Sequence, residues 1–260
     1  MSLVITNWLG RTSNNILQLI RAINYGYINK YNHILFPNHN LLNKNEINID
    51  IQSLNNKNIN INNSFFYSKE LNLQDPSPKL MKYYFNKYIQ PILKLNLFND
   101  IDNINTINDL YIHIRSGDCF AINAHKMYVP PPFSYYTKII ENKSWNKIIV
   151  VYEDAKNPCV NLLKNKNYNN IEFHSSTLEN DLNILSNCQN LVLGFGTFGL
   201  LIYFLSNNIK DLYIPDYAYN EMPHGDWDLN LNIINLPDYI KCGKWKLSNE
   251  NINKLINYNI

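Results

Sequence analysis

The segment from Tyr111 to Asp118 holds the residues best suited to chemistry in this chain of 260 residues, and it reads Tyr-Ile-His-Ile-Arg-Ser-Gly-Asp. Alternation along a strand would place His113 and Arg115 on one face, at the carboxyl end of that strand. A guanidinium there offers a planar fork of donors that suits a diphosphate, and it keeps its charge at neutral pH. It would stabilise negative charge that develops on a leaving phosphate. The alternative is a surface ion pair between Arg115 and Asp118 beside a glycine turn.

A glycine-rich turn from Gly194 to Gly199 reads Gly-Phe-Gly-Thr-Phe-Gly and lies between a predicted strand and a predicted helix. Glycines let the backbone approach a phosphate, and the helix N-terminus supplies N–H groups and a favourable dipole. Thr197 would add a hydroxyl. The turn lacks the Walker lysine and the spacing of a dinucleotide fingerprint. The alternative is a tight strand-to-helix turn without a ligand.

A second turn, from Gly10 to Asn15, follows the first predicted strand and also opens a helix. Its N–H groups or the side chain of Asn14 would contact a phosphate or a sugar. The alternative is an ordinary helix N-cap.

Strand and helix patterns alternate along the chain, which is typical of a parallel α/β sheet. Short apolar runs predict strands at 3–6, 33–36, 110–114, 147–152, 171–173, 191–193 and 212–214. Apolar spacing and capping residues predict helices ending near 27 and covering 79–97, 134–141 after a Ser134 cap, 157 onward, 179–188, 198–206 and 248–257 after a Ser248 cap. Residues 38–64 are rich in Asn and weakly patterned, which predicts a loop. Loops after the strands meet at one rim of such a sheet, where ligands bind.

Composition excludes several classes of protein. Hydrophobic residues make up 45% of the chain, which excludes global disorder, and a net charge of +2 with 17% charged residues argues against a nucleic-acid partner. No apolar run approaches the roughly 20 residues that span a bilayer, and no signal peptide is evident, so we expect a cytoplasmic protein. Abundant Asn, Ile, Lys and Tyr indicate an AT-rich genome, as in some large DNA viruses and protists.

The cysteines are widely spaced, without a Cys-x-x-Cys pair or a zinc pattern, so we expect reduced thiols. They are Cys119, Cys159, Cys188 and Cys242.

Three blocks, in order along the chain, resemble the GT-B fucosyltransferases that use GDP-fucose, namely the α-1,2, α-1,6 and protein O-fucosyltransferase families. His113–Asp118 matches their His-x-Arg-x-Gly-Asp block. Gly10–Asn15 resembles their Gly-Arg-x-Gly-Asn-Gln block, and Asp181–Phe198 resembles a third block in which an acidic residue precedes a strand and a Ser/Thr-Phe-Ser turn. The resemblance covers most of 1–20 and 107–206.

The chain departs from these families in two blocks. Ser13 and Asn15 stand where the N-terminal block has glycine and glutamine. Glycines replace serines in the third block and remove hydroxyl donors, which bears on the identity of the donor sugar.

The resemblance implies an α/β fold of the GT-B type, with two Rossmann-like lobes facing a cleft. Residues 1–106 would form the N-terminal lobe on the acceptor side, and residues 107–245 the lobe that binds the nucleotide sugar. The break would lie near Asn103–Asn108, and residues 246–260 would form a helix that crosses back to the first lobe.

The resemblance also implies roles for single residues. Arg115 would hold the β-phosphate of the donor, His113 would lie by the nucleotide, and Asp181 would accept hydrogen bonds from guanine or ribose. Asp118 would orient Arg115 or its turn. The remaining donor-binding residues would be Gly196, Thr197 and Phe198 at the diphosphate, and Gly10, Arg11 and Asn14, with Asn14 near the β-phosphate or fucose.

The implied reaction is inverting transfer of fucose from GDP-fucose to a glycan hydroxyl, without a metal or another cofactor. A base is optional, because the leaving phosphate would take the proton in an SN1-like reaction. Glu153 or Asp154, just past the strand that ends at Tyr152, would supply a base at the sheet rim. The alternative for both is an exposed carboxylate at a helix cap.

Other interpretations stay open. Asp226-Trp227-Asp228 would bind Mn²⁺ or Mg²⁺ in a metal-dependent transferase that uses another nucleotide sugar. The chain would otherwise be a non-catalytic carbohydrate-binding protein on the same fold. Tyr128–Pro132, Tyr135 and Tyr136 would wall an acceptor site or form a plain loop-to-helix junction.

Overall fold

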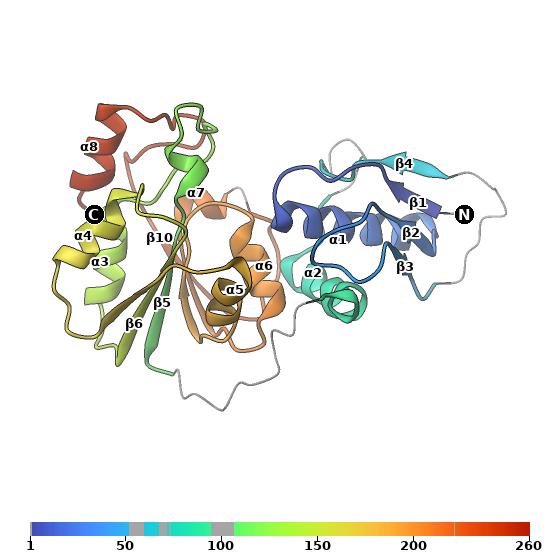
Figure 1. The fold of residues 1–260 in the computed structure, drawn as a ribbon, viewed down its shortest axis with the longest axis horizontal. Helices are drawn as coiled ribbons and strands as arrows, with labels where there is room; N and C mark the ends of the chain where they lie inside the picture. The colour runs from blue at the N-terminus through green and yellow to red at the C-terminus, as the bar shows by residue number, and fades with distance from the viewer. Residues whose placement is uncertain (1, 52–59, 68–71, 73, 95–106, 221) are drawn as a thin grey trace. The chain divides into compact units, whose positions relative to one another are not determined.

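The computed structural model describes residues 2–51, 60–67, 72, 74–94, 107–220 and 222–260, and the chain divides into two compact units. Unit 1 comprises residues 1–96, 203–205 and 223–227, and unit 2 comprises 97–202, 206–222 and 228–260. Each unit contains a sheet with parallel strands and helices packed beside it (Figure 1). This arrangement confirms the predicted α/β class and is consistent with the GT-B type. Most of the predicted break near Asn103–Asn108 lies outside the described residues.

The sheet of unit 1 has the strand order β3-β2-β1-β4. Its strands are β1 (Ser2–Ile5), β2 (His33–Leu35), β3 (Glu46–Asn48) and β4 (Ile61–Asn63). β1 pairs in parallel with β2 and β4, and β3 pairs antiparallel with β2. Residues 38–64 were expected to be a loop and instead contribute β3 and β4. Both strands are three residues long and rich in Asn, so they lack the apolar run that predicts a strand.

Helix α1 (Thr12–Asn29) packs on this sheet because its apolar residues recur at helical spacing. Ile16, Leu19, Ile20 and Ile23 are all buried on that face. The helix ends at Lys30, whose backbone takes the left-handed conformation with φ 60° and donates to the carbonyl of Gly26.

The predicted helix over 79–97 is three consecutive pieces in the described residues. They are α2 (Pro78–Tyr84), the π-helical turn η2 (Phe85–Ile89) and the 3-10 turn η3 (Gln90–Ile92). Ser77 caps α2, since its hydroxyl accepts from the N–H of Leu80 at 3.4 Å. Pro91 brings no N–H, so the α-helical pattern cannot continue through it.

Unit 2 carries a parallel sheet in the order β10-β9-β8-β5-β6-β7. Its strands are β5 (Asp109–Ile114), β6 (Lys147–Tyr152), β7 (Ile171–His174), β8 (Asn190–Val192), β9 (Asp211–Pro215) and β10 (Asn230–Ile234). The chain proceeds outward from β5 through β6 to β7, and then outward on the other side from β8 through β9 to β10. The order therefore reverses between β5 and β8.

Helices of unit 2 follow most of these strands, as the alternating pattern predicts. They are η4 (Gly117–Phe120), α3 (Phe133–Glu141), α4 (Pro158–Asn165), α5 (Leu178–Ser186), α6 (Phe198–Leu205, whose last residues group with unit 1), α7 (Asp216–Tyr219) and α8 (Asn249–Asn257). The predicted Ser134 cap is wrong. Helix α3 begins one residue earlier, after extended Pro132, so the buried Ser134 hydroxyl lies inside the first turn without a hydrogen-bond partner among the described residues.

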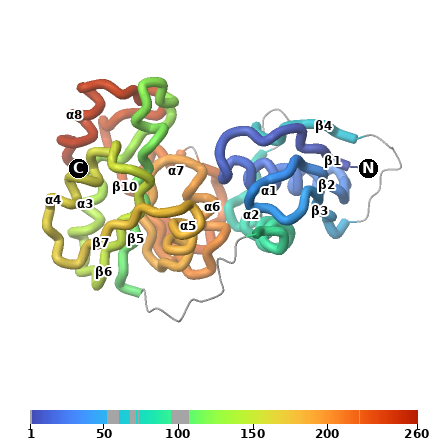
Figure 2. The backbone as a smooth tube through the Cα atoms, viewed as in Figure 1, coloured from blue at the N-terminus to red at the C-terminus, as the bar shows by residue number. Residues whose placement is uncertain are grey.

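Helix α8 was expected to cross back to the first lobe and instead packs on α3 and α4 within unit 2 (Figure 2). Its buried residues include Asn251 and Leu255. The side-chain amide of Asn251 donates to the carbonyls of Lys244 and Lys246, which fixes the preceding loop. Ser248 caps the helix, as predicted.

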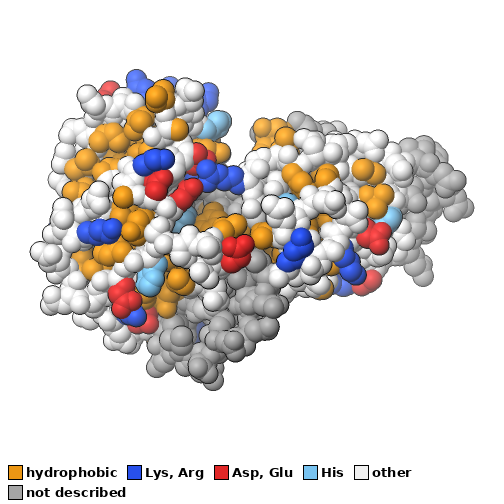
Figure 3. Space-filling view, viewed as in Figure 1, with side chains coloured by type: hydrophobic (Ala, Val, Ile, Leu, Met, Phe, Trp, Pro, Cys, Tyr) orange, Lys and Arg blue, Asp and Glu red, His pale blue; other side chains and the backbone are white. Residues whose placement is uncertain are grey.

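The surface agrees with the mild net charge. On the face shown in Figure 3, acidic and basic side chains lie in small mixed groups between apolar and uncharged ones. Among the helices of the described residues, none is long and apolar enough to cross a membrane. All four cysteines are free, as predicted.

Candidate active site

The two most informative motifs follow the two strands between which the order reverses. β5 pairs with β8 through Leu110–Asn190 and Ile112–Val192. In open α/β sheets, ligands bind at the carboxyl ends of the two strands between which the strand order reverses. Arg115 comes directly after β5, and Gly194 comes shortly after β8.

The Arg115 guanidinium lies against the backbone of Gly196. A Cβ built on Gly196 would lie 2.1 Å from Nη1 of Arg115, and Gly196 has φ +122°. Only glycine allows both this backbone conformation and this close approach. The structure therefore brings together two motifs that are about 80 residues apart in sequence.

Two further side chains hold the Arg115 guanidinium. Nη2 donates to both carboxylate oxygens of Asp118, at 3.2 and 3.3 Å. The ring of Tyr128 lies beneath its flat face, with its centroid 4.1 Å from Cζ. Burial disfavours the charge, but the neighbouring Cys119, Asp118 and Tyr128 outweigh it, so the pKa of Arg115 is raised. The ion pair of the structural alternative is present, and it occupies only one amino group of the fork.

His113 lies two residues before Arg115 and is half-buried. Its ring is 4.7 Å from the ring of Phe198, the first residue of α6. Burial, together with the nearby charge of Arg115, lowers the pKa of His113 to about 3. The imidazole is therefore neutral at neutral pH.

Helix α6 begins at the end of the turn that follows β8. The carbonyl of Thr197 accepts the N–H groups of Leu200 and Leu201 at 3.1 and 3.3 Å, which begins the helix. The N–H groups of a first helical turn have no acceptor within the helix and favour an anion. Gly196, Thr197 and Phe198 thus lie where the strand-to-helix turn ends and α6 begins, as the sequence predicts.

Two carboxylates follow β6, and they have different surroundings. Asp154 Oδ1 accepts from the Ser116 hydroxyl, from Gly117 N–H at 3.4 Å and from Lys156 N–H at 3.0 Å. Burial acts to raise the pKa of Asp154, but these donors and the Lys156 ammonium outweigh it and lower the pKa below its ordinary value. Glu153 is exposed, and a Cβ on Gly117 would lie 2.5 Å from its Oε2.

The described part of the chain also shows why the β5 turn keeps its shape. Ser116 is fully buried, and its oxygen accepts from Asn157 N–H at 3.0 Å. The Asn157 amide donates to the carbonyl of Arg115 at 3.0 Å and accepts from Cys159 N–H at 3.0 Å. The start of α4 is thereby joined to the residue that carries the guanidinium. No sequence pattern pairs Ser116 with Asn157, and Asn157 before Pro158 predicts only the start of a helix.

Asp181 lies on the first turn of α5 and is half-buried. Burial raises the pKa of its carboxyl group, and Ser176 donates to Oδ1 at 3.4 Å. No described contact joins it to Arg115.

The N-terminal turn belongs to unit 1. Gly10 has φ +74°, and a Cβ there would lie 2.1 Å from the amide nitrogen of Asn14. Arg11 occupies the N-cap of α1 without a side-chain cap. Two buried side chains stabilise the turn through Leu9. The Asn15 amide donates to the carbonyl of Leu9, and the N–H of Leu9 donates to the side-chain oxygen of Gln18.

Residues 50–224 match the model of the family described as Glycosyl transferase family 11, which covers more than half of the chain. The chain belongs to this family. It is therefore a glycosyltransferase of the fucosyltransferase type, as the resemblance predicts. Comparisons with curated proteins and with solved structures found no match.

In this family 11 transferase, Tyr135 and Tyr136 cannot belong to the predicted aromatic wall of an acceptor site. Tyr135 and Tyr136 are fully buried, and the Tyr135 hydroxyl donates to the carbonyls of Leu193 and Tyr213 at 2.8 and 3.0 Å. They belong to the core because the first turn of α3 packs on the sheet. Tyr128 remains half-exposed, on Arg115.

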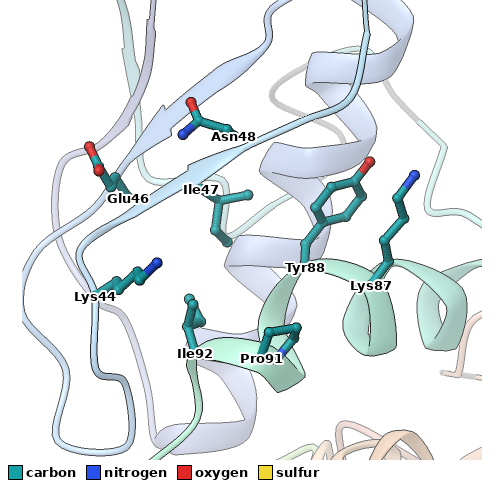
Figure 4. A pocket seen from close by; sticks show the side chains of 8 residues that line it. All are labelled: Lys44, Glu46, Ile47, Asn48, Lys87, Tyr88, Pro91 and Ile92. Carbon is teal, nitrogen blue, oxygen red and sulfur yellow. The ribbon is translucent and has the colours of Figure 1, made fainter.

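The transferase has a shallow cavity of about 220 Å³ in unit 1, apart from every predicted site residue. Figure 4 shows that its lining comes from β3 with the loop before it and from η2 and η3. The lining residues are Lys44, Glu46, Ile47, Asn48, Lys87, Tyr88, Pro91 and Ile92.

Asp226 and Asp228 are both exposed and belong to different units. Within the described ranges, no three His, Cys, Asp or Glu side chains gather as potential metal ligands.

Proposed function

We propose that this transferase moves fucose from GDP-fucose to a hydroxyl of a glycan acceptor, with inversion at the anomeric carbon and without a metal ion. The observation that carries the proposal is the guanidinium of Arg115 against the backbone of Gly196, where β5 and β8 end. Family membership supports the reaction class. The two supports are independent, because the family match says nothing of the geometry.

The diphosphate would bind between Arg115 and the first turn of α6. Asp118 binds Nη2 of Arg115, and Nη1 lies beside the Gly196 backbone, where it would face the diphosphate. Charge on the β-phosphate grows as the bond to the sugar breaks. A fixed guanidinium and oriented N–H groups stabilise that charge more in the transition state than in the ground state. Because His113 is neutral, Arg115 supplies the positive charge at this strand end.

We assign the guanine or ribose contact to Asp181. Its carboxylate is half-buried on α5 in the same unit as Arg115. A carboxylate accepts the paired N–H donors of guanine, and uracil lacks that pair. This assignment predicts selectivity for GDP over UDP. Gly10, Arg11 and Asn14 would contribute donor contacts from unit 1.

For the acceptor proton, the surroundings favour Glu153 over Asp154. The Asp154 carboxylate already accepts three hydrogen bonds and pairs with the Lys156 ammonium. These partners lower its pKa, which makes it a poor base. Glu153 is exposed at the sheet rim beside Gly117. In the proposed step the acceptor oxygen bonds to the anomeric carbon, the bond to the β-phosphate breaks, and Glu153 takes the hydroxyl proton as GDP leaves.

The test compares Arg115→Ala with Arg115→Lys. We expect Arg115→Ala to lower kcat by about 10²–10³ and to weaken GDP binding, in line with the loss of one oriented transition-state donor. Arg115→Lys keeps the charge but loses the planar fork, so its activity should be intermediate. Calorimetry with GDP, UDP and dTDP gives the nucleotide preference, which should be for GDP. Retained turnover in a folded Arg115→Ala protein would overturn the proposal.

A further inference from the structure

We infer that Tyr128 is a positioning residue that fixes the orientation of the Arg115 guanidinium toward the donor diphosphate, an inference that rests on the proposed function. Its place in the loop before α3 separates it from Arg115 by 12 intervening residues, so no strand or helix periodicity pairs the two. The structure alone places the Tyr128 ring on the guanidinium, at 4.1 Å from Cζ.

The surroundings of Arg115 define the direction of its fork. Tyr128 covers one flat face, Asp118 binds Nη2, and the Gly196 backbone lies beside Nη1. A guanidinium on a flexible side chain would otherwise rotate among several orientations, and ordering it on binding would cost side-chain entropy. With one face and one edge already held, the fork is oriented before the diphosphate arrives.

Tyr128 is itself held by contacts that do not involve Arg115. Its N–H donates to the carbonyl of His125 at 2.8 Å. The next two carbonyls in the chain, those of Val129 and Pro130, accept the hydroxyls of Tyr217 and Tyr239 at 3.1 and 2.9 Å. Both hydroxyl donors are tyrosines of the same unit, which anchor the segment to the core. The Tyr128 ring therefore has a fixed place onto which the guanidinium packs.

The same ring also contacts the diphosphate turn. Phe195, between Gly194 and Gly196 of that turn, lies 6.5 Å from Tyr128 between ring centroids. Tyr128 thus contacts both parts of the proposed phosphate site. An aromatic face attracts a guanidinium electrostatically and excludes water from one side of it, which strengthens its interaction with an anion on the other side. The ring supplies this effect without the hydroxyl, so phenylalanine should replace it.

The experiment measures GDP and guanosine affinity by calorimetry for Tyr128→Ala and Tyr128→Phe. We expect Tyr128→Ala to weaken GDP binding about 5- to 30-fold, as for loss of a partly desolvated cation–aromatic contact. Tyr128→Phe should stay within about twofold of wild type. Guanosine has no phosphate, so its affinity should not change in either variant. A folding defect would lower both affinities and the melting temperature, and that result would overturn the positioning role.

A double-mutant cycle tests whether Tyr128 acts through Arg115. We expect Tyr128→Ala to have no further effect on GDP binding in an Arg115→Ala protein. An additive effect of the two substitutions on GDP affinity would overturn the inference. So would a Tyr128→Ala protein that binds GDP with wild-type affinity while Arg115→Ala binds it more weakly. If Arg115→Ala itself binds GDP normally, the proposed function fails instead. The matched control is Tyr83→Ala, which removes an exposed tyrosine that also faces a cation, Lys87 at 5.7 Å, and should leave GDP affinity unchanged.

Discussion

His113 and Arg115 lie two residues apart at the end of one strand, but the structure shifts their pKa values in opposite directions. Burial and the charge of Arg115 lower the pKa of His113 to about 3. Arg115 stays charged at every pH at which the protein is studied. The strand end therefore presents one permanent cation and one neutral ring packed on Phe198. This division suits a diphosphate, because the charge of the site does not change near neutral pH.

The low pKa of His113 predicts a pH dependence of stability. Between about pH 3 and the ordinary value of 6.5, the unfolded chain binds a proton at His113 that the folded chain does not. The free energy of unfolding should therefore rise with pH across this window and level off above it. We expect His113→Gln to reduce that slope in urea unfolding at pH 4.5, 5.5 and 7.5.

The control is the pH range above about 7, where neither the folded nor the unfolded chain protonates His113, so wild type and His113→Gln should show the same slope. Below that range, identical slopes in wild type and His113→Gln would mean that the folded protein takes up the proton after all.

At the scale of elements, the turn after β5 is held by the start of α4. Asp154 and Asn157 satisfy the Ser116 hydroxyl, the Gly117 N–H and the Arg115 carbonyl. Ser116 and Asn157 are fully buried, and a buried donor or acceptor without a hydrogen bond destabilises the fold. The placement of Arg115 thus depends on a helix that begins about 40 residues later in the chain.

The neighbours Glu153 and Asp154 should separate stability from catalysis. Asp154→Ala removes the acceptor of the Ser116 hydroxyl and should lower the free energy of unfolding by about 1–2 kcal/mol. Glu153→Gln replaces an exposed side chain by one of the same size, so it should lower the free energy of unfolding less than Asp154→Ala does, and it should lower kcat by about 100-fold or more as the proposed base is lost. Urea unfolding and steady-state kinetics on both variants check this. Wild-type kcat in Glu153→Gln would leave the leaving phosphate as the proton acceptor.

At the scale of the whole molecule, each unit carries its own sheet, mixed in unit 1 and parallel in unit 2, and the motifs of the resemblance are distributed over both. Gly10, Arg11 and Asn14 lie in unit 1, whereas the residues from His113 to Phe198 lie in unit 2. In the proposed function, Arg115 and Asp181, which would bind the diphosphate and the guanine or ribose, both lie in unit 2.

We expect that the enzyme does not require a metal ion for transfer. Transfer should persist within about twofold after dialysis against EDTA, because Arg115 and the α6 N-terminus supply the charge that a cation would otherwise provide. The variant Asp226→Asn combined with Asp228→Asn should keep the same rate and the same melting temperature. Loss of activity that Mn²⁺ or Mg²⁺ restores would instead support the Asp-x-Asp interpretation.

The sequence predicts the fold best where a strand is a continuous run of branched apolar residues, as in β6, which reads Lys-Ile-Ile-Val-Val-Tyr. It fails at β10, which reads Asn-Leu-Asn-Ile-Ile on the sheet edge and mixes polar and apolar positions. It also fails at η2, where a π-helical turn replaces the expected α-helix. Local patterns cannot predict either, because pairing with β9 and packing of the helix decide them.

The segment His113–Asp118 and the turn Gly194–Gly199 show the same division within the site. Residue types and order along the chain determined that an arginine follows one strand, that a glycine turn follows another, and to which family they point. Only the tertiary structure decided that the two meet at Gly196, that Tyr128 covers Arg115, and that Tyr135 is core. The reason is that β5 and β8 are adjacent only through the reversal in strand order, and contacts across that reversal join residues whose separation in sequence carries no periodic signal.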